Sequence, residues 1–243
     1  MQETQIMNAL ADVMPLAMQD LDLIQGCGKV GLIIVDEVNG FATVGAGYLA
    51  PAAPNAQVSN MVTETNLLAR QFSGQSWPVL AFMDTHTPGK EEPPYPPHCE
   101  EGTGEEELVA ELKWLEEDQN TTLVRKDCIN GFIGAIDGGG ENTFVEWVLR
   151  HNLTDLLVVG ICTDICVMDF VLTSLSARNH GMLGKLKDIY VYEKGCATYD
   201  LPREGAVENG LPEAAAHPQE IAHYMGLYFM ASRGAKLVDV IIS

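Results

Sequence analysis

The stretch DLLVVGICTDICVMDFVLTSLSARNH, residues 155–180, carries the pattern that decides the fold. Its apolar run Leu156–Val159 is too short for a helix and rich in β-branched residues, which is typical of a buried strand. Gly160 ends this run, and Thr163 and Asp164 are suitable N-cap residues for a following helix. The stretch therefore predicts a buried strand that leads directly into a helix.

Cys166 falls in the first turn of this predicted helix, just beyond the carboxyl end of the strand. Unpaired backbone N–H groups and the positive end of the helix dipole favour a thiolate at such a position. The alternative is a small apolar residue packed beneath the helix, which is the commoner role of a lone cysteine. The rest of the chain decides between these two interpretations.

Five further short apolar runs are typical of strands, and segments with helical spacing alternate with them. The strand-like runs are 30–35, 77–83, 121–124, 189–192 and 237–242, and the helical segments include 58–72, 105–115, 143–151 and 218–232. This alternation predicts an α/β fold: a doubly wound, mostly parallel six-stranded sheet with helices on both faces. No break in composition divides the chain, which favours a single domain over residues 1–243, with 1–28 as an N-terminal helical lead-in.

The formal charge of −20 argues against partners that are nucleic acids or anionic membranes, because their phosphates would be repelled. Six cysteines without a CxxC pair indicate reduced thiols rather than a disulfide framework or a zinc knot. The N-terminal residues lack the pattern of a signal peptide, and no apolar stretch is long enough to cross a bilayer. We therefore expect an intracellular, cytoplasmic protein, and the sequence leaves its oligomeric state open, a homo-oligomer included.

Four predicted strands in succession are each followed by a reactive or charged side chain. These residues are Asp36, Asp84 with His86, Lys126 and Cys166. The carboxyl ends of parallel strands share one edge of the sheet, where α/β proteins place their sites. A single charge at a strand end is usually a solvated loop residue, but four together are much harder to explain in that way. The pattern predicts a crevice in which Asp36 accepts the proton of the Cys166 thiol and Lys126 stabilises the pair.

Asp84 and His86 are separated by one residue, so in extended backbone both side chains point to the same side. His98 lies in the long Pro-rich and acidic segment 87–104, and loops of this length in compact domains usually carry function or are disordered. One carboxylate and two imidazoles suit zinc or a similar divalent ion with positions left open. A D-x-H triplet is common, however, so spacing alone leaves a metal-free site open.

A Cys–His dyad is the weaker alternative for activation of the thiol. His151 and His180 lie near the ends of predicted helices, and His217 lies near the start of one. None of the three follows a predicted strand, so none is placed at the same edge as Cys166 by the pattern alone.

Four segments, in this order, resemble the isochorismatase-like cysteine hydrolases, and among them the plant type of nicotinamidase. The segments are IIVDEVNGF (33–41), DTHTPG with PPYPPHCEEGT (84–103), VRKDCINGF (124–132) and VVGICTDICV (158–167). The resemblance implies hydrolysis of nicotinamide to nicotinate and ammonia through a cysteine thioester, a step of NAD salvage. The alternatives are another amidase or ureide hydrolase of this family, and a non-catalytic binding protein on the same fold.

The resemblance also implies the roles of individual residues. It implies a catalytic triad of Asp36, Lys126 and Cys166. It further implies an oxyanion hole formed by the backbone N–H groups of Cys162 and Cys166, with a cis peptide bond before Cys162.

The same resemblance implies a cofactor and a binding pocket. Asp84, His86 and His98 would bind one divalent metal ion, zinc by expectation, which contacts the pyridine nitrogen of the substrate nicotinamide. Phe41 and Tyr95 match aromatic positions that line the pocket for the ring.

The sequence departs from the family pattern in three respects. Val38 replaces the usual Gln two residues after the triad Asp, and Tyr95 stands where Trp is frequent. Glu91 and Glu92 occupy the loop where many members carry an additional metal-binding His. These departures bear on the metal and on the shape of the pocket rather than on the triad.

Overall fold

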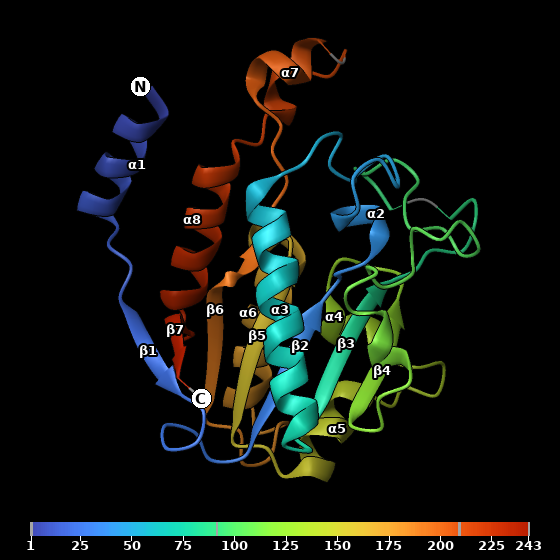
Figure 1. Cartoon of the computed structure of the whole chain (residues 1–243), viewed down its shortest axis with the longest axis vertical. Coiled ribbons are helices and arrows are strands. Elements are labelled where there is room, and N and C mark those ends of the chain that lie inside the picture. Colours follow the sequence, from blue (N-terminus) through green and yellow to red (C-terminus); the bar gives the residue numbers. More distant parts are fainter. Residues whose placement is uncertain (1, 91, 209, 243) are drawn as a thin grey trace.

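The computed structural model describes residues 2–90, 92–208 and 210–242. Within this part of the chain, seven strands form one sheet in the order β1-β7-β6-β5-β2-β3-β4, with every neighbouring pair parallel (Figure 1). The strands are β1 Met18–Asp22, β2 Val30–Val35, β3 Val79–Asp84, β4 Thr121–Lys126, β5 Asp155–Ile161, β6 Asp188–Ala197 and β7 Lys236–Ile242. The predicted parallel, doubly wound α/β fold is confirmed, with one strand more than the six expected.

The additional strand is β1, which lies inside the predicted helical lead-in. Residues Gln2–Val13 do form a helix, α1, but Met18–Asp22 pairs in parallel with β7 at the edge of the sheet. Its sequence MQDLD has no apolar run, and only Leu21 is fully buried. Backbone hydrogen bonds to β7 therefore hold a segment that its side chains do not identify as a strand.

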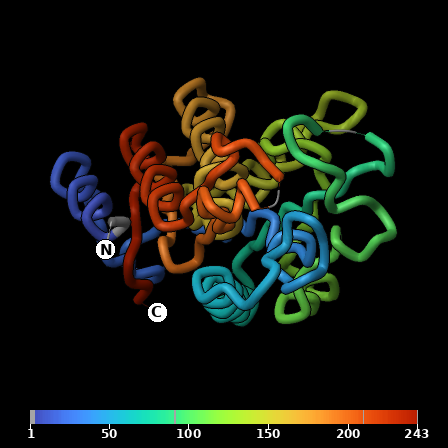
Figure 2. Tube along the Cα trace, turned by 90° about the horizontal axis from the view of Figure 1, so that it is seen from above, coloured from blue at the N-terminus to red at the C-terminus, as the bar shows by residue number. Residues whose placement is uncertain are grey.

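Helices cover both faces of the sheet, as Figures 1 and 2 show. The longer helices are α3 Ala56–Gly74, α5 Thr143–His151, α6 Met168–Asn179 and α8 Gln219–Ala231, and the short ones are α2 Asn39–Ala42, α4 Gly131–Gly134 and α7 Arg203–Glu208. Strand β2 shows how the strands serve both faces, because Ile33 and Val35 join the core beneath α5, α6 and α8, whereas Leu32 and Ile34 join the core beneath α3. Among the described helices, none is long and apolar enough to span a membrane.

The order of the strands reverses between β2 and β5, and this is the point at which α/β sheets open a crevice. Val35 pairs with Gly160 at the carboxyl ends of the two strands. Gly160 has a φ of 131°, and a Cβ atom there would lie 2.1 Å from the Val35 carbonyl oxygen. Only glycine allows this close approach, which brings the segments that follow the two strands together.

The segment 105–115, predicted to be helical, forms only a short 3₁₀ turn, η1 Lys113–Glu116, at its end. Its backbone instead pairs with the chain that leaves β2. The Glu105 and Glu107 carbonyls accept hydrogen bonds from the N–H groups of Gly40 and Asn39, both at 2.8 Å. The apolar spacing is explained by packing, because Leu108, Val109, Leu112 and Leu115 are all buried in the core beneath α3.

Candidate active site

Lys126 lies at the centre of a buried cluster formed where three strands end. Its Nζ is 2.8 Å from Asp36 Oδ2, 2.7 Å from Asp84 Oδ1 and 2.9 Å from the Cys128 carbonyl oxygen. Asp84 and Lys126 are the last residues of β3 and β4 and pair directly across the sheet. The side chain of Lys126 has no exposed surface, so its ammonium group is held by protein oxygens rather than by water.

Asp36 follows β2 in a backbone conformation that is unusual for a residue with a side chain. Its φ is 55°, in the left-handed region that costs a non-glycine residue about 1 kcal/mol or more. Two backbone hydrogen bonds fix it, from Asp36 N to the Phe82 carbonyl at 3.1 Å and from Val38 N to the Asp36 carbonyl at 2.7 Å. Strain of this kind is characteristic of functional positions.

The charges of the cluster shift the pKa values of its members in different directions. Burial raises the pKa of Asp36 to about 6, although the Lys126 charge opposes the shift. Burial also raises the pKa of Asp84, but Lys126 and the two neighbouring imidazoles outweigh it and hold that pKa well below its usual range. Burial lowers the pKa of Lys126, yet the anionic neighbours raise it well above its ordinary value. The result is a fixed cation between a permanent anion and a carboxyl that titrates near neutrality.

Cys166 reaches the same cluster from the turn that follows β5. The residues Thr163–Val167 form a π-helical turn, η2, and α6 begins only at Met168. Cys166 is buried, and this burial raises the pKa of its thiol well above the ordinary value while Lys126 opposes the shift. Cys166 lies in the first helical turn after β5, as predicted, but burial acts against the thiolate, so the thiol needs a base. Asp36 is within interaction range of it.

The predicted capping roles of Thr163 and Asp164 were wrong. The N-cap position of η2 is Cys162, which makes no side-chain capping bond. The Thr163 hydroxyl lies 2.7 Å from His223 Nδ1, and Asp164 accepts a hydrogen bond from Thr198. Both side chains are directed to the C-terminal part of the chain, which no local sequence pattern indicates.

The predicted metal-binding residues converge on one carboxylate oxygen. Asp84 Oδ2 lies 3.0 Å from His86 Nε2 and 3.2 Å from His98 Nε2, and the three ligand atoms all lie within 4.8 Å of one another. His98 Nδ1 is 2.8 Å from the Pro96 carbonyl, which can only accept, so this nitrogen carries the proton. Nε2 is then free to act as a ligand. Metal-binding histidines commonly donate the proton of the other ring nitrogen to a carbonyl in this way.

Glu92 adds a second carboxylate beside these imidazoles. Its Oε2 lies 3.6 Å from His86 Nε2 and 3.7 Å from His98 Nε2, while its Oε1 accepts a hydrogen bond from Ile129 N at 2.8 Å. Two carboxylate oxygens and two imidazole nitrogens form a donor set that suits a divalent ion. Glu92 was noted from the sequence as a departure from the family pattern in this loop, but no role was assigned to it. Its companion Glu91 lies outside the described residues.

The two predicted pocket aromatics both lie against His98. The ring centroid of Phe41 is 5.6 Å and that of Tyr95 is 6.1 Å from the His98 ring. Burial raises the pKa of Tyr95 to about 12, with further contributions from Cys162 and Cys166. Tyr95 is therefore close to both the metal-type cluster and the thiol.

The backbone around Cys162 has the form that the resemblance implied. The Ile161–Cys162 peptide bond is cis. The Cys162 carbonyl accepts from Ile165 N at 3.0 Å and from Val167 N at 3.1 Å, on either side of Cys166. Of the predicted dyad histidines, His217 binds Asp164 and none is positioned by a hydrogen bond to the Cys166 thiol among the described contacts.

Comparisons with known proteins identify the family of the chain. The isochorismatase domain model matches residues 30–238, most of the chain. The chain belongs to the isochorismatase family. This family member is 51% identical to Nicotinamidase 1 of Arabidopsis thaliana over 236 residues, which cover 97% of this chain and 96% of that protein.

Two crystal structures share the fold at low identity. Nicotinamidase PncA from Bacillus subtilis aligns with a TM-score of 0.64 and 23% identity, covering 87% of this chain and 100% of that one. Pyrazinamidase of Pyrococcus horikoshii in complex with zinc aligns with a TM-score of 0.62 and 19% identity, covering 87% and 99%. At these identities the likeness concerns the fold.

Proposed function

We propose that this isochorismatase-family protein is a nicotinamidase, which converts nicotinamide to nicotinate and ammonia and so serves NAD salvage. The observation that carries the proposal is the buried Lys126 ammonium, which contacts Asp36 at 2.8 Å and Asp84 at 2.7 Å. Through Lys126, Asp36, which interacts with the Cys166 thiol, is connected to Asp84 and thus to a cluster with metal-binding character. The identity of 51% to the Arabidopsis nicotinamidase supports the choice of substrate.

Formation of the thioester uses Asp36 and Cys166. Asp36, with a pKa of about 6, is ionised at neutral pH and accepts the thiol proton as the sulfur attacks the carboxamide carbon. The backbone N–H groups of Cys162 and Cys166 stabilise the oxyanion. When the C–N bond breaks, the proton passes from Asp36 to the leaving nitrogen, and ammonia departs.

Hydrolysis of the thioester repeats the proton transfers with water. Asp36 accepts a proton from the attacking water, the C–S bond breaks, and the proton returns to the Cys166 sulfur as nicotinic acid forms. The acid then loses its proton to solvent, where the released ammonia takes it up, and the product leaves as nicotinate. Lys126 keeps its charge throughout, because the neighbouring carboxylates hold its pKa well above the ordinary value. Its role is to stabilise anionic Asp36 and the developing thiolate.

Asp84, His86 and His98, with Glu92 beside them, would hold one divalent ion, and we propose zinc. When bound, the ion supplies a Lewis-acid contact for the pyridine nitrogen of the substrate. Phe41 and Tyr95, which lie against His98, would then flank the pyridine ring of the substrate. The ring would be held by these aromatics and the ion, and the carboxamide would be held near Cys166.

The remaining parts of the proposal concern the whole chain. We propose a single domain over residues 1–243 that acts in the cytoplasm on a small molecule, without nucleic-acid or membrane partners and as a homo-oligomer or a monomer. All six cysteines are free thiols, which supports a reducing compartment. The charge of −20 supports the absence of polyanionic partners.

Ammonia release from nicotinamide tests the proposal, with a carbamoyl amino acid as the competing ureide substrate. The wild type should release ammonia from nicotinamide, Cys166→Ala should abolish turnover while remaining folded, and Cys99→Ala and Cys196→Ala should retain most activity. Mass spectrometry of the quenched reaction should locate the acyl group on Cys166. Turnover of the ureide alone would support the rival amidase, and binding without turnover of either compound would support a non-catalytic protein.

A further inference from the structure

The η2 turn, which carries Cys166, is held by side chains that follow it by some 30 to 60 residues in the chain. Thr163 Oγ1 lies 2.7 Å from His223 Nδ1, 60 residues on. Thr198 Oγ1 donates to Asp164 Oδ1 at 2.7 Å, across 34 residues. These bonds act on two of the three residues that separate Cys162 from Cys166, so they bear directly on where the thiol lies.

The second oxygen of Asp164 binds His217. His217 Nε2 is 2.8 Å from Asp164 Oδ2, and His217 Nδ1 is 2.9 Å from the Tyr199 carbonyl oxygen. A carbonyl and a carboxylate can only accept hydrogen bonds, so both ring nitrogens must carry a proton. Burial lowers the pKa of His217, but Asp164 and the Tyr199 carbonyl raise it by more. The net pKa of His217 is therefore above its ordinary value. The pair is therefore an imidazolium bound to a carboxylate.

His217 is itself firmly held. Its ring stacks on that of Tyr199, with centroids 3.8 Å apart and planes inclined by 13°. Its backbone exchanges two hydrogen bonds with Leu201, at 2.7 and 2.9 Å. This bridge closes the base of the segment that contains α7, which lies beyond the end of the sheet next to α8 (Figure 1). An anchored cation with two directed bonds can fix the carboxylate that it binds.

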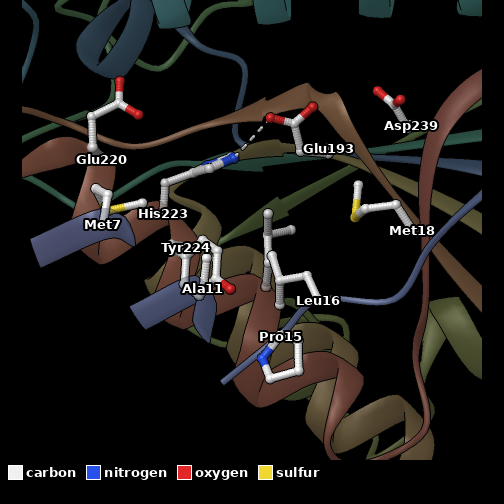
Figure 3. Close-up of a pocket in the computed structure, with 11 residues that line it drawn as sticks. Met7, Ala11, Pro15, Leu16, Met18, Glu193, Glu220, His223, Tyr224 and Asp239 are labelled. Carbon is white, nitrogen blue, oxygen red and sulfur yellow. Dashed lines mark ion pairs between the residues drawn. The ribbon is translucent and has the colours of Figure 1, made fainter. Parts of the chain in front are cut away.

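His223 makes a less demanding contact. Its Nδ1 faces the hydroxyl of Thr163, which can donate or accept, and its Nε2 lies 3.6 Å from Glu193 Oε1 at the wall of a pocket between α1 and α8 (Figure 3). The helix α8 also supports the turn directly, because a Cβ on Gly226 would lie 2.8 Å from Asp164 Cα. The turn is thus supported by α8 packing at Gly226 and by the hydrogen bonds of Asp164 to Thr198 and His217.

We propose that His217 is a positioning residue for Cys166, acting through Asp164. The imidazolium–carboxylate pair holds the η2 turn so that the thiol stays in reach of Asp36 and Lys126. The inference rests on the proposed function only in taking Cys166 as the nucleophile. A displacement of about 1 Å at a reacting atom can lower a rate about a hundredfold, so a turn without this restraint should react slowly while binding substrate almost normally.

Three variants separate positioning from simple stabilisation. His217→Phe retains an aromatic ring over Tyr199 but cannot bind Asp164, whereas His217→Gln retains an N–H donor. We expect His217→Phe to lower kcat about tenfold or more with KM within about threefold of wild type, and His217→Gln to recover part of the loss. In a double-mutant cycle, Asp164→Asn should add little to His217→Phe, because both remove the same interaction.

Alkylation of Cys166 by iodoacetamide gives a readout that involves no substrate. It should slow in His217→Phe by a factor similar to that in kcat, and His180→Phe, at an exposed histidine of α6's C-terminal end, should alkylate like wild type. If wild type does not hydrolyse nicotinamide, the proposed function fails while alkylation still tests the inference. Wild-type alkylation in folded His217→Phe, or additive effects in the cycle, would overturn it. Should His217→Phe not fold, wild-type alkylation in both His217→Gln and Asp164→Asn would do the same, and slow alkylation in Asp164→Asn would support it.

Discussion

Replacing Lys126 by Met removes a charge that contacts both Asp36 and Asp84 while keeping much of the side-chain volume. In the wild type, Nζ lies 2.8 Å from Asp36 Oδ2 and 2.7 Å from Asp84 Oδ1, with no exposed surface on the lysine side chain. The Met variant would leave two buried carboxylates facing each other without a cation. Breaking a buried ion pair in this way typically costs about 3–5 kcal/mol.

The protein can avoid most of this cost by binding a proton at Asp36. At about 1.4 kcal/mol per pKa unit, a loss of about 3–5 kcal/mol raises a carboxyl pKa by about 2–4 units. The pKa of Asp36, about 6 in the wild type, would move well above neutrality. Only about a tenth to a thousandth of the variant would then carry the ionised base at neutral pH, and turnover should fall by about the same factor. The loss should shrink as the pH is raised.

The assay measures ammonia release and iodoacetamide alkylation of Cys166 over a range of pH, together with melting. We expect both rates to fall in Lys126→Met and both profiles to shift to higher pH, with melting lowered least in mild acid, where Asp36 is protonated. Lys126→Arg should restore little, because a planar guanidinium does not fit between two close anions. Lys185→Met, at an exposed lysine, is the control and should change stability by no more than about 0.5 kcal/mol. Wild-type turnover with an unshifted alkylation profile in Lys126→Met would refute the reasoning.

Three further expectations concern the charges of the site and its surroundings. Because Asp36 must be ionised to accept the thiol proton, kcat/KM should rise with pH up to about 6 and then level off; a flat profile through this range would contradict its role. His86→Ala should lose bound divalent metal and Glu92→Gln should bind it about tenfold more weakly or worse, measured by metal analysis after dialysis; His151→Ala is the control, and retention of metal by His86→Ala would exclude the site. Burial raises the pKa of Glu37 well above 4.5 although Thr65 donates to it at 2.6 Å, so its contribution to stability is complete at low pH and declines as the pH rises above that value. Glu37→Gln should therefore melt progressively higher than wild type as the pH is raised, and parallel melting curves would show that Glu37 is not buried in its neutral form.

The position of the site could be predicted because it follows from the apolar runs of the sequence and from their order along the chain. Buried parallel strands are continuous apolar runs, and the residue after each run must lie at the shared edge. Asp36, Asp84, Lys126 and Cys166 were located in this way. Strand β1 could not be, because edge pairing with β7 needs only backbone groups and its sequence MQDLD carries no apolar run.

Contacts between distant segments were beyond the sequence for a different reason. Thr163 and Asp164 have the residue types of helix caps, but their side chains bind His223 and His217 once α8 has packed against the turn. Local preference for a cap is worth only about 1 kcal/mol and is overridden when tertiary partners offer buried hydrogen bonds of comparable or greater strength.

The cluster's charge balance gives a physical reason for its two halves to occur together. Asp36 and Asp84 contact Lys126, and Glu92 lies beside the two imidazoles, so three carboxylates share the site with one lysine. This leaves two negative charges beside imidazoles that bind a metal only when Nε2 carries no proton. A divalent cation at the Asp84 cluster would balance that excess. Lys126 contacts Asp84 Oδ1, whereas the imidazoles contact Oδ2, so one carboxylate serves both halves. The Lys126 charge, which tunes Asp36, and the divalent ion that would position a substrate ring are therefore coupled through Asp84. Neither half of the site is electrostatically independent of the other.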